Sequence, residues 1–324
     1  MKQNYPPDII ASLFHEYFPE KEIISFSLCD GGAENSNFLI ETANGKYILK
    51  IFENSKNEFE IVQSEVAIMT FVREKWVCVP RVFVVQATWE RIVLWPENKP
   101  VILLEYIVGE QYRDTIPPDM CFVNLWAETA RLHNALKTIS GKYFIEETHK
   151  FDFKYLLRES WLRNVGEDLL DRDFLNRIWE DIDTVADTFL SLDQQIIHDD
   201  INRGNVIFWA NNTPCVIDFS DIVVSARIQD IAITLVQFCC TAFWYPDGVN
   251  HYLRGYESVN VLSIDEKECL FACLELRLLN ILLIPYLDTG LGDGDSFREQ
   301  TLRYQKYLYR LHEFGKENFM KLIP

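Results

Sequence analysis

The spacing of apolar residues changes from mainly strand-like to mainly helical about one third of the way along the chain. Up to residue 106, apolar residues recur in short runs that are bounded by turn signals such as Asn44-Gly45. These patterns predict strands at 23–27, 38–42, 47–52, 82–85, 91–95 and 101–106, with helices at 9–18 and 58–74. Beyond this point helical spacing dominates, and 324 residues are too many for one ordinary core. We therefore predict two packed lobes, residues 1–106 and residues 107–324.

The second lobe has few strand signals. Helical patterns cover 126–136, 153–163, 174–189, 266–287 and 296–314, and the apolar run 231–245 is too short for a membrane span and predicts a buried helix. Strands are expected only at 195–197, 206–209 and 215–217, the last two joined by Asn211-Asn212. The expected fold class is α+β, with an antiparallel sheet and a helix in the first lobe and a larger, mainly helical second lobe.

Charge and cysteine content exclude several classes of protein. The formal net charge is −18 at pH 7, which argues against nucleic acid or an anionic membrane surface as partner. The acidic balance is compatible with a cationic substrate, although it more often serves solubility. The eight cysteines form no CxxC pair and mostly lie in apolar runs, so we expect reduced, buried thiols in a cytoplasmic protein. Residues 1–7 contain no signal-peptide core.

Two neighbouring segments contain the candidate catalytic and metal-binding residues. Residues 198–205 read His-Asp-Asp-Ile-Asn-Arg-Gly-Asn, and Val-Ile-Asp-Phe follows at 216–219. Phosphoryl transfer requires a carboxylate that accepts the proton of the attacking hydroxyl group. It also requires an amide and a second carboxylate that hold Mg²⁺ against the nucleotide phosphates. Asp200, Asn205 and Asp218 are the candidates for these three roles, in that order.

This pattern resembles the catalytic and metal-binding segments of the kinase fold. It is closer to the aminoglycoside phosphotransferase and choline kinase group than to protein kinases. The resemblance covers roughly residues 25–290 and implies a two-lobed protein-kinase-like fold, with ATP as phosphate donor and Mg²⁺ as metal. Asp199 stands where the family commonly has glycine, which leaves open which of two adjacent aspartates is the base. The spacing to Asn205 favours Asp200.

Three further positions of this lobe are interpreted through the same resemblance. Ser220 replaces the glycine that protein kinases carry after Asp-Phe. His198 is expected to brace the loop rather than to transfer protons. Asp230 is expected to cap a helix or brace a loop.

The first lobe would supply the nucleotide-binding parts. Lys50 lies in the predicted strand 47–52, from which a lysine can reach the α- and β-phosphates, and Glu65 on the following helix is its expected partner. Glu58 and Glu60 compete with Glu65 for that role but are less well placed by spacing. An exposed Lys–Glu pair without function is the alternative.

A loop and a connecting segment complete the expected nucleotide site. Residues 31–37, which include Ser36, would cover the phosphates, because small residues and hydroxyl or amide donors suit close approach to phosphate. Main-chain groups of Glu105 and Ile107 would pair with the adenine edge where the lobes join. A core strand that simply leaves the sheet would look nearly the same.

The resemblance also narrows the expected activity. Residues 32–38 resemble the loop of type II homoserine kinases, and residues 217–221 with 230–235 resemble both that group and the hydroxylysine kinases. Only eleven residues separate Asp218 from Asp230, which leaves no room for the long activation segment of a regulated protein kinase. We therefore expect an ATP-dependent kinase that phosphorylates a hydroxyl group of a small amine-bearing metabolite, first of all a hydroxy amino acid.

Other substrates and other functions remain alternatives. Aminoglycosides and choline or ethanolamine are the next acceptor classes, so the acceptor is expected to be cationic or zwitterionic. A compact bacterial-type protein kinase and a non-catalytic nucleotide-binding module are the rival functions. Candidates for the acceptor pocket are aromatic and charged residues of the second lobe, namely Trp161, Arg163, Trp244, Tyr245, Glu275 and Arg277.

Overall fold

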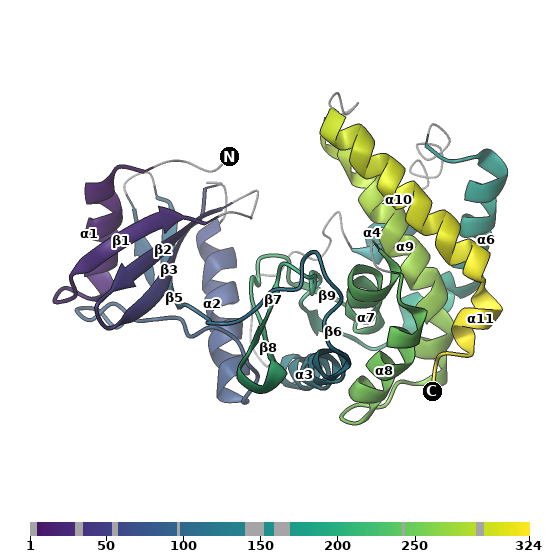
Figure 1. The fold of residues 1–324 in the computed structure, drawn as a ribbon, viewed down its shortest axis with the longest axis horizontal. Coiled ribbons are helices and arrows are strands. Elements are labelled where there is room, and N and C mark those ends of the chain that lie inside the picture. The colour runs from purple at the N-terminus through teal and green to yellow at the C-terminus, as the bar shows by residue number, and fades with distance from the viewer. Residues whose placement is uncertain are drawn as a thin grey trace.

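The protein has a sheet lobe and a helical lobe, with two short pairs of antiparallel strands between them (Figure 1). The computed structural model describes residues 5–29, 35–53, 58–95, 98–139, 152–158, 169–241, 244–289 and 295–324. The expectation of a two-lobed α+β architecture is confirmed. The boundary near residue 107 stays a prediction. It agrees with Glu110, whose amide and carbonyl groups each bond to Phe208 of the second lobe at 2.9 Å.

The first lobe is built on one antiparallel sheet with strand order β1-β2-β3-β5-β4. Helix α1 (Pro7–Tyr17) packs on one face, and α2 (Glu58–Glu74) lies on the side of the second lobe (Figure 1). The strands are β1 (Ile23–Leu28), β2 (Ser36–Thr42), β3 (Gly45–Ile51), β4 (Ile92–Leu94) and β5 (Pro100–Glu105). Side chains alternate along β3, so Leu49 enters the core beneath α1 while Lys50 faces the second lobe.

The strand expected at 82–85 does not form, which corrects the sequence prediction. Only Val82 makes an isolated bridge, to Leu104, and the amide of Phe83 bonds to the carbonyl of Leu103 at 2.9 Å. The reason is competition for one edge of β5. Strand β4 pairs with the first half of that edge, through Ile92 and Ile102, and leaves only its end for the incoming segment.

The second lobe consists mainly of helices, with two short pairs of antiparallel strands on the side that faces the first lobe (Figure 1). Its helices are α3 (Asp119–Lys137), α4 (Phe153–Arg158), α6 (Arg172–Ser191), α7 (Ile228–Leu235), α8 (Pro246–Glu257), α9 (Ile264–Thr289), α10 (Asp295–Phe314) and α11 (Lys316–Met320). The paired strands are β6 (Gln194–Ile197) with β9 (Val223–Ala226), and β7 (Val206–Trp209) with β8 (Thr213–Val216). Among the described helices, none has the apolar length that crossing a membrane requires.

Two local features of this lobe position the functional loops. The turn between β7 and β8 holds Asn211 and Asn212 at φ 61° and 55°, the left-handed values that a tight hairpin needs and asparagine tolerates. The expected buried helix 231–245 begins earlier, at Ile228, and continues beyond Leu235 as a π-helical turn, Val236–Cys240. Strand β9 and helix α8 were not anticipated.

A close helix crossing gives a testable prediction. Gly255 of α8 lies against α3, and a Cβ atom placed there would come within 2.6 Å of the Val123 carbonyl oxygen and 3.1 Å of Trp126 Cβ. We expect Gly255→Ala to lower the free energy of unfolding by about 1–3 kcal/mol, because the two helix backbones must separate. Urea unfolding measures this. Arg254→Ala, one residue away on the exposed side, should change it by less than about 0.5 kcal/mol. Equal effects would contradict the close packing.

Candidate active site

A cavity of about 250 Å³ lies between the lobes. Six residues that the sequence predicted for nucleotide or metal binding line it together: Lys50, Glu65, Glu105, Ile107, Asn205 and Asp218. They come from β3, α2, β5 and the segment that follows it, and the loops around β7 and β8. Residues up to 168 positions apart in sequence thus meet at one place.

Lys50 lies between two carboxylates at the inner wall of this cavity. Its Nζ is 2.9 Å from Glu65 Oε1 and 3.0 Å from Asp218 Oδ1. Burial alone would lower the pKa of Lys50, but the charges of Asp218 and Glu65 outweigh it and raise the pKa above its ordinary value. The Lys50 charge in turn lowers the pKa of Asp218, which therefore stays ionised. Glu60, a competitor for the partnership, is exposed.

The Asp200 carboxylate is held by the side-chain amides of two asparagines and by one arginine guanidinium group. Its Oδ2 accepts from Asn202 Nδ2 at 2.7 Å and from Asn205 Nδ2 at 2.8 Å, and its Oδ1 lies 3.3 Å from Arg277 Nη2. Burial raises the pKa of Asp200, and the Arg277 charge opposes that shift. The side chain keeps 22% of its surface exposed, so it remains accessible to an incoming hydroxyl group.

Asp199 points the other way. Its backbone is left-handed, at φ 64°, which explains why glycine suits this position. Its carboxyl group is buried, accepts a hydrogen bond from the Gln229 amide, and leaves Oδ2 without a hydrogen-bond partner among the described residues. Of the two adjacent aspartates, only Asp200 therefore faces the loop that carries Asn205.

The buried carboxyl group of Asp199 lowers the free energy of unfolding by an amount that depends on pH. Burial, followed by the nearby Asp230 charge, raises the pKa of Asp199 well above its ordinary value. A carboxyl group with a higher pKa in the folded state costs no stability below its unfolded pKa and costs more as pH rises towards the folded pKa. Asp199→Asn, which removes the charge and keeps the shape, is expected to raise the free energy of unfolding at pH 8 by more than about 1 kcal/mol.

The measurement is urea unfolding of both proteins between pH 5 and pH 8, at about half-unit steps. The gain from Asp199→Asn should shrink as pH falls. Asp193→Asn, which alters an aspartate with 91% of its side chain exposed, serves as the control and should show no such trend. A gain that is independent of pH would count against a buried ionisation.

Two buried residues brace the loop from behind. Asp230 accepts from the backbone amides of His198 at 2.8 Å and Asp199 at 2.6 Å, and from His133 Nε2 at 3.0 Å. Nε2 of His198 donates to the Ile217 carbonyl at 3.2 Å, which leaves Nδ1 to accept from the Asp200 amide at 3.3 Å. Both ring nitrogens of His198 are thereby hydrogen-bonded within the protein. His198 and Asp230 act as braces, as the sequence suggested.

Ser36 requires a correction. Its side chain is fully buried and donates to Glu53, which also accepts from Lys99 at 2.9 Å, so its hydroxyl group does not face the cavity. Side chains alternate along β2, and the next residue, Asn37, lines the cavity opposite Lys50 instead. Residues 30–34, which hold most of the expected phosphate-covering loop, lie outside the described residues.

The segment between the lobes also brings unforeseen residues to the cavity. The Glu105 carboxylate accepts from the Arg81 amide at 3.1 Å and lies 3.0 Å from Arg73 Nη1. The Glu105 amide donates to the Arg81 carbonyl at 2.9 Å, so the Glu105 carbonyl is the group that stays a candidate for the adenine edge. Gln111 and Arg113 line the cavity as well, and Gln111 donates to the Gly204 carbonyl at 2.6 Å. No sequence signal identifies these two, because nothing in the local pattern shows that residue 111 folds back onto the loop.

Three of the four described acceptor-pocket candidates make their contacts away from Asp200. Trp244 packs on Phe314, the Tyr245 hydroxyl donates to Asp119, and Glu275 lies 2.6 Å from His312 on α10. Arg277 alone among the described candidates contacts Asp200. Trp161 and Arg163 lie outside the described residues.

Comparison with known proteins identifies the family. A family model described as "Phosphotransferase enzyme family" matches residues 25–262, well over half of the chain. The chain belongs to this family. Members of the family are phosphotransferases, and the chain is accordingly an ATP-dependent enzyme that phosphorylates a hydroxyl group of a small molecule. The use of a nucleotide together with a divalent metal follows from the same membership.

Several relatives resemble this phosphotransferase. It is 26% identical over 247 residues to a homoserine kinase of Janthinobacterium sp. (strain Marseille), covering 73% of this chain and 72% of that protein. It is 26% identical over 165 residues to a hydroxylysine kinase of Xenopus laevis, covering 46% and 44%. Among solved structures, a microcompartment-associated aminopropanol kinase matches with a TM-score of 0.73 at 17% identity, covering 98% of this chain and 100% of that one. This structural likeness confirms the two-lobed fold.

Proposed function

We propose that this phosphotransferase transfers the γ-phosphate of ATP to the hydroxyl group of a hydroxy amino acid, in the cytoplasm. The observation that carries the proposal is the convergence of Lys50, Asp218 and Asn205 at the interlobe cavity, with Asp200 held beside them by the Asn205 amide at 2.8 Å. Lys50 would orient the nucleotide phosphates, with Glu65 holding it in place. Asp200 would orient the acceptor hydroxyl group and take its proton.

Mg²⁺ is the proposed metal, and the donor atoms fit it. Asn205 Nδ2 donates to two acceptors of Asp200, the backbone oxygen at 3.0 Å and Oδ2 at 2.8 Å, which leaves Asn205 Oδ1 available as a ligand. The Asp218 side chain is ionised and 37% exposed. One amide and one carboxylate oxygen, completed by phosphate oxygens and water, are the hard ligands that Mg²⁺ prefers. The metal would neutralise charge on the transferred phosphoryl group.

Arg277 supports an amino acid as the acceptor. Its guanidinium group lies beside the proposed base, where the non-reacting part of an acceptor must also lie. An arginine can bind a carboxylate through two parallel hydrogen bonds, which an amino alcohol such as choline cannot use. The relatives named homoserine kinase and hydroxylysine kinase are named for acceptors that carry such a carboxylate.

Variants of Arg277 test this assignment. Arg277→Lys keeps the positive charge beside Asp200 but loses the bidentate geometry, and it should raise KM for a hydroxy amino acid about tenfold or more. Turnover of an amino alcohol of similar size, if it is detectable, should change much less. An equal loss on both acceptors would show that Arg277 acts only through Asp200.

The proposed function itself is tested by ADP release with Mg-ATP. The acceptors are homoserine, hydroxylysine, choline, ethanolamine, aminopropanol and an aminoglycoside. Turnover that depends on homoserine or hydroxylysine and disappears in Asp200→Asn supports the proposal. Turnover only with an amino alcohol or an aminoglycoside would show that the acceptor belongs to that class and is not a hydroxy amino acid. Phosphorylation of the protein itself without an acceptor would indicate a protein kinase. ATP binding without turnover of any acceptor favours a binding module.

A further inference from the structure

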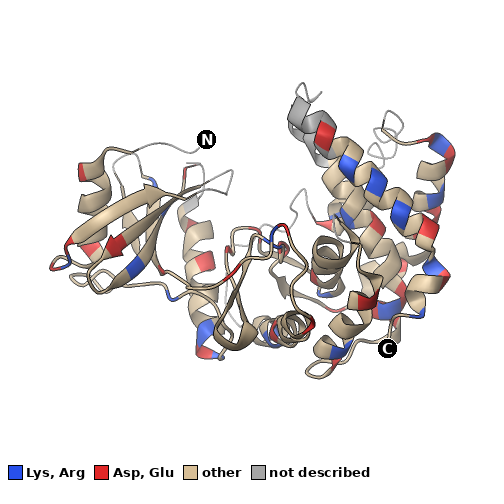
Figure 2. Ribbon diagram, in the orientation of Figure 1, with Lys and Arg blue, Asp and Glu red and all other residues tan. Residues whose placement is uncertain are grey.

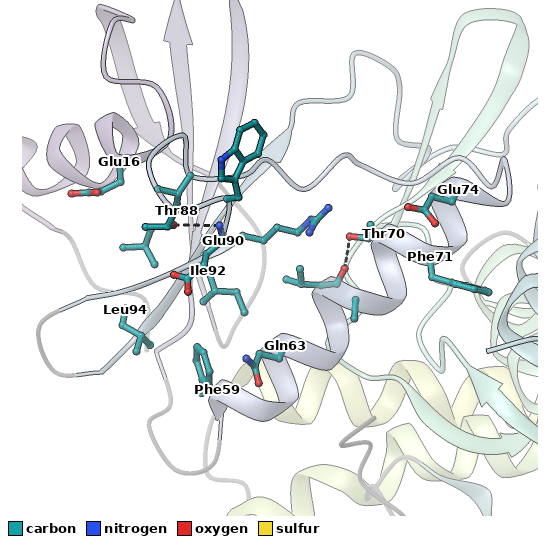
Figure 3. A pocket seen from close by; sticks show the side chains of 16 residues that line it. Glu16, Phe59, Gln63, Thr70, Phe71, Glu74, Thr88, Glu90, Ile92 and Leu94 are labelled. Carbon is teal, nitrogen blue, oxygen red and sulfur yellow. Dashed lines mark hydrogen bonds between the residues drawn. The ribbon is translucent and has the colours of Figure 1, made fainter. Parts of the chain in front are cut away.

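A second, larger cavity of about 820 Å³ lies behind helix α2. One wall is the side of α2 that faces away from the interlobe cavity, and the other is formed by residues 85–94, which lead into β4. Figure 3 shows Phe59 and Gln63 of α2 across from Ile92 and Leu94. We call this cavity the α2 groove. None of the residues predicted for catalysis or nucleotide binding lines it.

Helix α2 separates the α2 groove from the catalytic cavity. Glu65 and Met69 line the catalytic cavity, whereas Gln63, Ala67 and Thr70 line the groove. At about 100° per residue, these two sets point to opposite sides of the helix. A molecule in the groove would therefore press on the back of the helix whose front places Glu65 against Lys50.

Apolar side chains are left open to solvent along this groove. Phe59, Trp89 and Leu94 expose 40%, 77% and 52% of their surface. Trp89 also has a left-handed backbone, at φ 61°, which is uncommon for a bulky residue. Its amide donates to the Val85 carbonyl at 2.9 Å, so the turn holds the indole ring at the rim rather than in the core. Large apolar groups grouped on one surface mark interaction sites.

The charges around the α2 groove indicate which charge its occupant carries. Glu16, Glu74 and Glu90 line it, and among the described lining residues Arg91 is the one basic residue. An occupant that complements this surface carries positive charge and offers an oxygen acceptor to Arg91. Acidic residues are spread over both lobes, and the net charge is −18, so a second copy of this chain is a poor fit (Figure 2).

We propose that the α2 groove binds a basic peptide segment of a partner protein, anchored by an aromatic side chain, and that its binding alters the Lys50–Glu65 contact through α2. Backbone carbonyl groups of the peptide would meet Arg91, and its lysine or arginine side chains would meet Glu74 and Glu90. The second part of the proposal rests on the nucleotide-positioning role proposed for Lys50.

Selection from a displayed library of random short peptides on the full-length protein tests the docking site. We expect enrichment of peptides that combine basic and aromatic residues and that lose at least tenfold in affinity for Trp89→Ala. The matched control is Trp76→Ala, because Trp76 is 92% exposed and left-handed at φ 66° but does not line the groove. Glu74→Lys combined with Glu90→Lys reverses the charge without removing an apolar contact, and it should also weaken binding.

The outcomes separate the two parts of the proposal. No enrichment, enrichment of acidic peptides, or binding that Trp89→Ala and the charge reversal leave unchanged overturns the docking site. If a groove-dependent peptide is found, KM for ATP is measured with and without it. A change in KM that disappears in the charge-reversal variant supports coupling through α2, and an unchanged KM overturns the coupling alone. ATP turnover without peptide reports separately on the proposed function.

Discussion

Replacement of Asp200 by asparagine is expected to lower kcat by about 10²- to 10⁴-fold, the range that a positioned general base contributes. The amide has nearly the shape of the carboxylate but cannot take the proton of the acceptor hydroxyl group. It also cannot accept all the hydrogen bonds that Asn202, Asn205 and Arg277 now donate to Asp200. Steady-state turnover with a saturating acceptor measures kcat.

Two further measurements show whether the loss is chemical. ATP binding, followed by calorimetry, should change little, because the nucleotide contacts proposed for Lys50 and Asp218 remain. Asp199→Asn changes the neighbouring aspartate, which faces Gln229 in the interior, and should retain most of the activity. If Asp199→Asn were the more damaging variant, the assignment of the base to Asp200 would be wrong.

Lys50→Met is expected to reduce kcat/KM for ATP by about 10²- to 10³-fold, as for the loss of one preorganised electrostatic donor. The change also leaves the Glu65 and Asp218 carboxylates without the cation between them, at distances of 2.9 and 3.0 Å. Removing one partner of a buried ion pair costs about 3–5 kcal/mol of stability. Urea unfolding and ATP-dependent kinetics are therefore measured on the same preparations.

The chain contains a matched control for this variant. Lys99 and Glu53 form another buried ion pair of the first lobe, with 2.9 Å between their charged atoms and little exposure of either side chain. Lys99→Met should destabilise the protein in a similar way, while kcat/KM per folded molecule stays near that of the unchanged protein. If both variants lost activity in proportion to stability, the role proposed for Lys50 in holding ATP would be contradicted.

Local patterns predicted most of the elements and failed where strands compete for one edge or where no turn signal marks a short strand. Helix α2 and strands β2, β3 and β5 follow from periodicity, because amphipathic spacing over a whole element is a local property. The segment 82–85 has an equally good strand pattern, but β4 already pairs with that edge of β5. Strand β9 is as short as β7 and β8 but has no turn signal such as Asn211-Asn212 to mark it, and it is defined by its pairing with β6.

By itself, the sequence determined the family pattern and the residue types that phosphoryl transfer needs. It also determined the spacing between Asn205 and Asp218, which flank the short β7–β8 hairpin. The tertiary structure alone decided which way each group points. It turned Ser36 inward and Asn37 towards the cavity, and it brought Arg277 from α9 to Asp200, 77 residues away in the chain. It also buried Asp199 while leaving Asp200 at the surface of the loop. Orientation depends on backbone angles and on packing between elements distant in sequence, and no local pattern records either.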